Sequence, residues 1–136
     1  MIKMSTKATV SDSSSPAIEV QQRKVDEHTI VLAIDGELDL ATAPALKWSL
    51  LDVLEAGYSQ LVLDLSGVGF MDSTAIGVLV GIKRQLVAGQ RLAIASLQAD
   101  VLKIFEVTGL DGSFHIASNV EDALSAARHE GHLAAG

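Results

Sequence analysis

Three consecutive polar residues, Asp72, Ser73 and Thr74, open an apolar stretch of the chain within GFMDSTAIGVLVGIKRQL. Each of these side chains can accept a hydrogen bond from the free N–H groups at the start of a helix, although a helix start needs only one such acceptor. Taken alone, the cluster is interpreted most simply as a helix cap. A serine hydroxyl at an exposed helix start can also accept a phosphoryl group, which would add about −1.5 to −2 charges beside Asp72.

A second polar group lies earlier in the chain, where Asp35, Glu37 and Asp39 alternate with Gly36 and Leu38 in IDGELDLATA. Alternation places the three carboxylates on one side of an extended chain, so a divalent cation site or a general acid/base pair has to be considered. No histidine or further carboxylate lies at a supporting spacing. A polar strand end that leads into a helix is the favoured interpretation, and we expect neither a metal nor another cofactor.

The spacing of apolar residues predicts the elements that position these two groups. Alternating or continuous apolar runs predict strands at residues 18–24, 29–35, 60–65, 91–96 and 114–117, the first two as a hairpin. Helical spacing predicts helices at residues 42–56, 72–88, 99–108 and 120–129, with Thr42 as the N-cap of the first. The strand, helix and strand at residues 60–96 form a βαβ unit with parallel strands. Sites in such sheets lie at the carboxyl ends of the strands, which predicts that Ser73 is near the surface.

These elements predict one α/β domain at residues 18–130, with helices packed on a mixed sheet. Residues 1–17 include the serine-rich run SDSSSP, which cannot bury apolar surface, so we expect a disordered N-terminal tail. Residues 131–136 are expected to fray as a C-terminal tail. Trp48 and Phe105 lie at apolar positions of predicted helices, and we expect both to be core or helix-packing residues rather than platforms for a ligand.

The charge balance limits the classes of partner. The chain has 17 Asp and Glu residues against 10 Lys and Arg residues, a net charge of −7. An acidic surface repels phosphate backbones, so nucleic acid is not expected as a partner. No apolar run has the length of a secretion signal or of a membrane span, and cysteine is absent. We therefore expect a soluble protein of the cytoplasm.

Four stretches together resemble a known family. GELDLATA, LVLDLSGV, FMDSTAIGVLVG and VTGLDGSF occur in this order between about residues 30 and 124. In their order and content they resemble the bacterial anti-sigma factor antagonists built on the STAS domain. The resemblance implies a single STAS domain of the α/β class, a mixed sheet of four to five strands flanked by about four helices.

The resemblance also implies a role in partner switching and no enzymatic activity. In such families the unphosphorylated antagonist binds an anti-sigma factor, a serine kinase of the GHKL type, and so releases the sigma factor. The kinase supplies the ATP and phosphorylates the serine that corresponds to Ser73, which ends binding, and a PP2C-like phosphatase restores the active form. The free antagonist is expected to be a monomer. The implied partner-binding residues are Asp39, Asp72, Thr74, Ala75 and Ile76.

One position departs from the family pattern. Members usually have glycine after the two hydroxyl residues, as in DSSGLGVL, whereas this chain has Ala75. Alanine should stiffen the first helical turn slightly relative to glycine.

Two other functions are compatible with the same residues. One is a constitutive STAS regulatory subunit of a membrane transporter or a signalling scaffold; the pair Ser73 and Thr74 favours the switch over this alternative. The other is a small enzyme that uses Asp35, Glu37, Asp39 and Asp72 as a metal or acid/base site.

Overall fold

The computed structural model describes residues 18–135, with side chains described as far as residue 127. The predicted N-terminal tail, residues 1–17, lies outside the described residues. The elements are β1 (Glu19–Lys24), β2 (Thr29–Asp35), α1 (Ala43–Glu55), β3 (Gln60–Gly67), α2 (Ser73–Gln85), β4 (Arg91–Ala95), α3 (Ala99–Val107), the 3-10 helix η1 (Leu110–Gly112), β5 (His115–Ala117) and α4 (Val120–Ala135). Helix α4 therefore continues past residue 129, where the sequence predicts its end.

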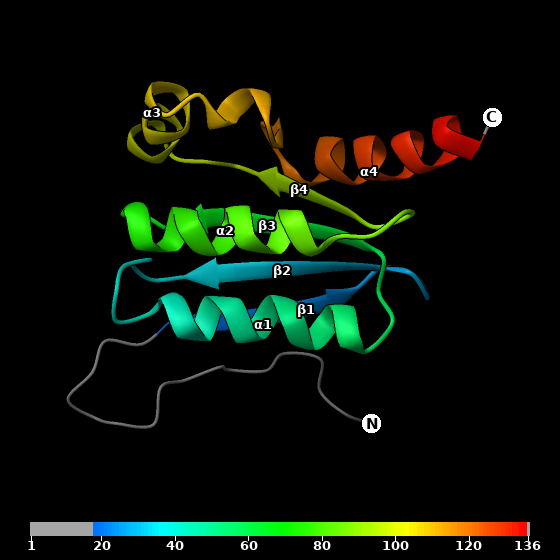
Figure 1. The fold of residues 1–136 in the computed structure, drawn as a ribbon, viewed down its shortest axis with the longest axis horizontal. Helices are drawn as coiled ribbons and strands as arrows, with labels where there is room; N and C mark the ends of the chain where they lie inside the picture. Colours follow the sequence, from blue (N-terminus) through cyan, green and yellow to red (C-terminus); the bar gives the residue numbers. More distant parts are fainter. Residues whose placement is uncertain (1–17, 136) are drawn as a thin grey trace.

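The five strands form one sheet in the order β1-β2-β3-β4-β5 (Figure 1). β1 is antiparallel to β2, and the other three pairs are parallel. The mixed sheet and the α/β class predicted from the sequence are confirmed. The apolar runs of β2 and β3 are buried on both faces because helices cover central parallel strands from both sides.

The helices pack on both faces of the sheet. The larger core lies under α1, α2 and α3, and it includes Leu50, Leu79 and Phe105 together with Leu63 of β3. The smaller core lies between the sheet and α4, which packs on β3, β4 and β5. Within residues 18–135, no helix combines the length and the apolar character that a membrane crossing requires.

The two aromatic residues expected in the core or in helix packing have different surroundings. Phe105 is fully buried and packs edge-to-face on Phe114, with ring centroids 5.9 Å apart, as predicted. Trp48 is 60 % exposed, so it does not belong to the core. The buried stripe of α1 consists of Ala43, Leu46, Ser49, Leu50 and Val53, and a turn of about 100° per residue places position 48 on the opposite side of the helix.

Gly67, the last residue of β3, lies very close to the end of β2. A Cβ atom at this position would overlap the carboxylate of Asp35 and would lie 2.9 Å from the backbone oxygen of Ile34. The Gly67 carbonyl oxygen also accepts a hydrogen bond from the Gly36 amide at 3.1 Å. Glycine is therefore needed here for the close approach of two backbones.

Substitution of two glycines by alanine is predicted to have opposite effects on stability. Gly67→Ala should lower the free energy of unfolding by about 1–3 kcal/mol, because the new methyl group forces neighbouring backbone to shift. Gly81→Ala is the matched control, since a Cβ atom there meets nothing within 4 Å inside α2. It should raise the free energy of unfolding by about 0.4–1 kcal/mol. Urea denaturation followed by circular dichroism measures both, and equal effects would contradict the packing described.

Candidate functional site

The loops that follow β2 and β3 are joined at the carboxyl ends of these neighbouring strands. Leu38 and Met71 form an isolated parallel bridge. The Leu38 amide donates to the Phe70 carbonyl oxygen at 2.9 Å, and the Asp72 amide donates to the Leu38 carbonyl oxygen at 3.0 Å. Leu38 and Met71 are buried beneath these bonds. The two polar groups found in the sequence, one from each loop, therefore lie at the same end of the sheet.

Asp72 is the residue that caps α2. Its backbone is extended, with φ −110° and ψ −176°. Its carboxylate oxygen Oδ1 accepts hydrogen bonds from the Thr74 amide at 2.9 Å and the Ala75 amide at 3.2 Å. One side chain thus satisfies two of the free amides of the first turn. The capping role suggested for the whole cluster belongs to Asp72.

Ser73 and Thr74 have exposed side chains in the first turn of α2. Within the described part of the chain, the Ser73 hydroxyl has no hydrogen-bond partner, because Asp72 already performs the capping. Thr74 lines a shallow groove of about 280 Å³ between α1 and α2, and Ser73 lies outside that groove. The Ser73 hydroxyl is thus presented on an open surface, which suits a macromolecular partner better than a small substrate.

Asp39 and Thr42 hold the loop between β2 and α1 in shape. The Asp39 carboxylate accepts from the amides of Ala41 and Thr42, at 3.0 and 3.1 Å. The buried Thr42 hydroxyl donates to the Glu37 carbonyl oxygen at 2.6 Å and accepts from the Asp39 amide at 2.9 Å. Thr42 is the N-cap residue of α1, as predicted, although its side chain makes no capping hydrogen bond.

The other two carboxylates of the GELD segment, Asp35 and Glu37, are exposed. The structure therefore gives the three carboxylates different surroundings, because Asp39 alone turns back onto the amides of its own loop. Among the side chains of residues 18–127, no three from His, Asp or Glu come together in a way that could hold a metal ion.

Two of the expected partner-binding residues are buried. Ala75 is fully buried and Ile76 is 9 % exposed, because both face the core below α2. Their roles in partner binding stay predictions. Asp72 and Asp39 are half-buried, and their roles in partner binding, like that of Thr74, stay predictions.

Two exposed apolar residues in the loops at this end of the sheet were missed by the sequence reasoning. Leu40 is 72 % exposed and Phe70 is 47 % exposed, one in each of the two bridged loops. The bridge buries Leu38 and Met71, and their neighbours Leu40 and Phe70 are left outside. Each of the two short loops holds more than one large apolar residue, and this was the available indication in the sequence. Leu40 and Phe70 are called the apolar pair below.

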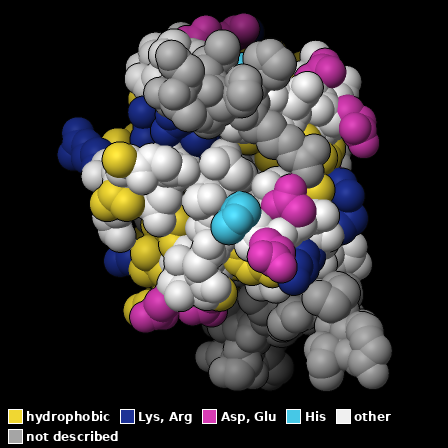
Figure 2. Space-filling model, turned by 90° about the vertical axis from the view of Figure 1, so that its right-hand side faces the viewer, with side chains coloured by type: hydrophobic (Ala, Val, Ile, Leu, Met, Phe, Trp, Pro, Cys, Tyr) yellow, Lys and Arg dark blue, Asp and Glu magenta, His cyan; other side chains and the backbone are white. Residues whose placement is uncertain are grey.

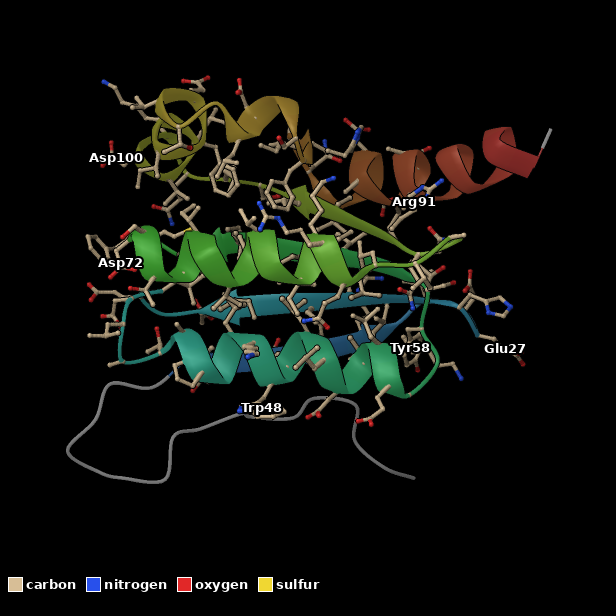
Figure 3. The ribbon with its side chains drawn as sticks, in the orientation of Figure 1. Glu27, Trp48, Tyr58, Asp72, Arg91 and Asp100 are labelled. Atoms are coloured by element: carbon tan, nitrogen blue, oxygen red, sulfur yellow. The ribbon has the colours of Figure 1, made fainter. Side chains whose placement is uncertain are left out.

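The site occupies one end of the molecule. Asp72 at the start of α2 and Asp100 in the first turn of α3 lie at this end, and Glu27 and Tyr58 lie at the opposite end (Figure 3). The opposite end carries interspersed acidic and basic side chains around a histidine (Figure 2). The end that presents Ser73 therefore combines an unbonded hydroxyl, the apolar pair and nearby carboxylates.

Comparison with known proteins agrees with this architecture. The model of the STAS domain matches residues 18–123. The anti-sigma-B factor antagonist of Bacillus subtilis is 34 % identical over 102 residues, which cover 72 % of this chain and 90 % of that protein. The anti-sigma-B factor antagonist of Listeria monocytogenes is 36 % identical over 110 residues, which cover 80 % of this chain and 94 % of that protein.

A solved structure gives the same result for the fold. The crystal structure of an anti-sigma factor antagonist from Mycobacterium paratuberculosis superposes with a TM-score of 0.76 at 28 % identity, over 88 % of this chain and 99 % of that one. The family resemblance found in the sequence motifs is therefore confirmed. The chain belongs to the STAS-domain family, and its relatives there are anti-sigma factor antagonists.

Proposed function

We propose that this protein is an anti-sigma factor antagonist and that phosphorylation of Ser73 switches it off. The observation that supports the proposal is that two adjacent side chains at the start of α2 have different roles. Asp72 caps the helix with its carboxylate, and the adjacent Ser73 hydroxyl stays exposed and unbonded. The names of the relatives support the role of antagonist, since those proteins share about a third of their residues with this chain.

The proposed partner is an anti-sigma factor that is a serine kinase of the GHKL type. It would contact the apolar pair, Leu40 and Phe70, and the exposed first turn of α2. Exposed apolar side chains beside a modifiable hydroxyl are suited to a protein interface that modification can break. The kinase supplies ATP, the antagonist has no catalytic activity of its own, and a PP2C-like phosphatase removes the phosphoryl group. The exchange takes place in the cytoplasm.

The local geometry indicates why the phosphoryl group would act on the partner rather than on the fold. The amides of Thr74 and Ala75 already donate to Asp72, so they are not available to a phosphoryl group on Ser73. The helix N-terminus stabilises a nearby negative charge by only about 0.3–1 kcal/mol. Covering an unpaired phosphoryl dianion with an apolar partner surface costs several kcal/mol, and this desolvation cost, the larger of the two effects, opposes binding.

The alternative of a constitutive STAS subunit in a transporter or scaffold makes no use of the unbonded Ser73 hydroxyl. The alternative of a small enzyme requires Asp39 to bind a metal or substrate, although its carboxylate is already bonded to two loop amides. No observation favours either alternative over the switch.

The first prediction concerns the acceptor. Incubation with the cognate kinase and ATP should add one phosphoryl group to the wild type and to Thr74→Ala, and none to Ser73→Ala, as measured by intact mass. Ser73→Glu should bind the kinase at least about tenfold more weakly than the wild type, because a carboxylate would be desolvated at the interface. A phosphorylated Ser73→Ala, or a Ser73→Glu variant that binds normally, would refute the assignment.

The second prediction concerns the apolar pair. Leu40→Ser and Phe70→Ser should each weaken binding of the unphosphorylated protein to its kinase by about tenfold or more, as expected for central apolar contacts. Val87→Ser is the matched control, since Val87 is 65 % exposed and follows the other end of α2. Calorimetric titration measures all three. If the three variants bound the kinase with equal affinity, the apolar pair would not be part of the interface.

A further inference from the structure

The loop from β3 to α2 is held on its second side by a residue that follows β4. Successive carbonyl groups of a strand point to opposite sides. The Gly67 carbonyl oxygen faces β2, where it accepts from the Gly36 amide, so the Ser66 carbonyl oxygen faces the side of β4. Because β4 ends at Ala95, a side chain supplies the donor on this side. Gln98 Nε2 donates to the Ser66 carbonyl oxygen at 2.8 Å, across 32 positions of the sequence.

The chain makes an unusual turn between the end of β4 and Gln98. Ser96 has φ +64°, and among the described residues it is the only one other than glycine with a positive φ. Its amide donates to the Ala117 carbonyl oxygen at 3.0 Å. Backbone of this kind is uncommon outside glycine and is concentrated at functional sites. After this turn Gln98 is the N-cap residue of α3, which begins at the same end of the sheet as α2 (Figure 1).

The loop that Gln98 holds carries Phe70, one of the apolar pair. The Phe70 carbonyl oxygen accepts from the Leu38 amide at 2.9 Å, which attaches the loop on the side of β2. Gln98 attaches it on the side of β4. The glutamine side chain also lies along the loop, since a Cβ atom at Gly69 would be 3.5 Å from Gln98 Oε1. The segment that ends at the 47 % exposed Phe70 is therefore fixed from both sides.

We propose that Gln98 is a positioning residue of the surface that binds the anti-sigma factor. Its side-chain amide holds the loop from Ser66 to Phe70 in the shape in which Phe70 meets the partner. The proposal rests on the proposed function, because the affinity that it explains is the affinity for the anti-sigma factor. A loop that is ordered before binding loses less conformational entropy on binding, so it binds more tightly. One exposed hydrogen bond contributes modestly, so the expected change in affinity is about threefold to tenfold.

Binding of the unphosphorylated protein to its kinase tests the role of Gln98. Gln98→Ala should weaken this binding about threefold to tenfold in a calorimetric titration. Gln90→Ala is the matched control, since Gln90 Oε1 accepts from the Val87 amide at 2.9 Å in the loop after the other end of α2. Its affinity should stay within about twofold of that of the wild type. Equal affinities of Gln98→Ala and Gln90→Ala would overturn the proposal.

A double-variant cycle tests whether Gln98 acts through Phe70. In the Phe70→Ser background, Gln98→Ala should weaken binding by less than about twofold, because the side chain that Gln98 positions is gone. If Gln98 contacted the partner by itself, its replacement would weaken binding equally in both backgrounds. That result would overturn the positioning role.

Amide hydrogen exchange of the free protein separates this proposal from the proposed function. The Leu38 amide donates to Phe70 and the Val68 amide to Leu65, so both amides report the order of the loop. Gln98→Ala should speed their exchange at least about threefold, whereas Gln90→Ala should leave it unchanged. Circular dichroism checks that each variant is folded. A wild type that binds no anti-sigma factor would refute the proposed function, while unchanged exchange in Gln98→Ala would overturn the positioning role even if the wild type binds.

Discussion

The site depends on the bridge between the loops that follow β2 and β3. Two backbone hydrogen bonds, from the Leu38 amide to Phe70 and from the Asp72 amide to Leu38, fix the carboxyl ends of two neighbouring parallel strands to each other. The buried side chains of Leu38 and Met71 shield these bonds from water. Because the bridge fixes the position of Asp72, it also fixes the start of α2 and makes Ser73 the first residue of its exposed turn. The close approach of Gly67 to the end of β2, just before the bridge, shows how little space separates the two chain segments.

Because the bridge fixes the two loops, the polar residues that they carry have different roles. Asp72 and Asp39 each turn a carboxylate back onto local amides, so both stabilise the backbone that carries the site. The Ser73 hydroxyl forms no such hydrogen bond with the described backbone. A phosphoryl group there gains little from the helix N-terminus, whose best amides are taken, and it would remain at the surface. In the proposed switch, the loss of binding free energy would therefore arise mainly from the desolvation of the phosphoryl group at the partner interface.

Much of the fold could be predicted from the sequence, since β2, β3, β4 and the helices show clear apolar periodicity. The position of Ser73 followed from the rule for strand ends, and the family followed from four motifs in one order. The sequence did not reveal which individual side chains lie at the surface and which lie in the core. Ala75 and Ile76 are buried although they adjoin the exposed serine, and Trp48 is exposed although its neighbours on α1 are buried. These outcomes depend on which side of a helix meets the sheet. The exposure of Leu40 and Phe70 depends on a bridge between loops 33 positions apart, Leu38 to Met71, which local patterns do not reveal.

Modification of Ser73, as proposed, changes recognition and leaves the fold intact. The most direct test compares the protein before and after complete phosphorylation at Ser73, measuring in one preparation the affinity for the anti-sigma factor and the free energy of unfolding. We predict that the affinity falls at least about tenfold while the free energy of unfolding changes by less than about 1 kcal/mol. An unchanged affinity, or a loss of binding that accompanies destabilisation by several kcal/mol, would contradict the proposed switch.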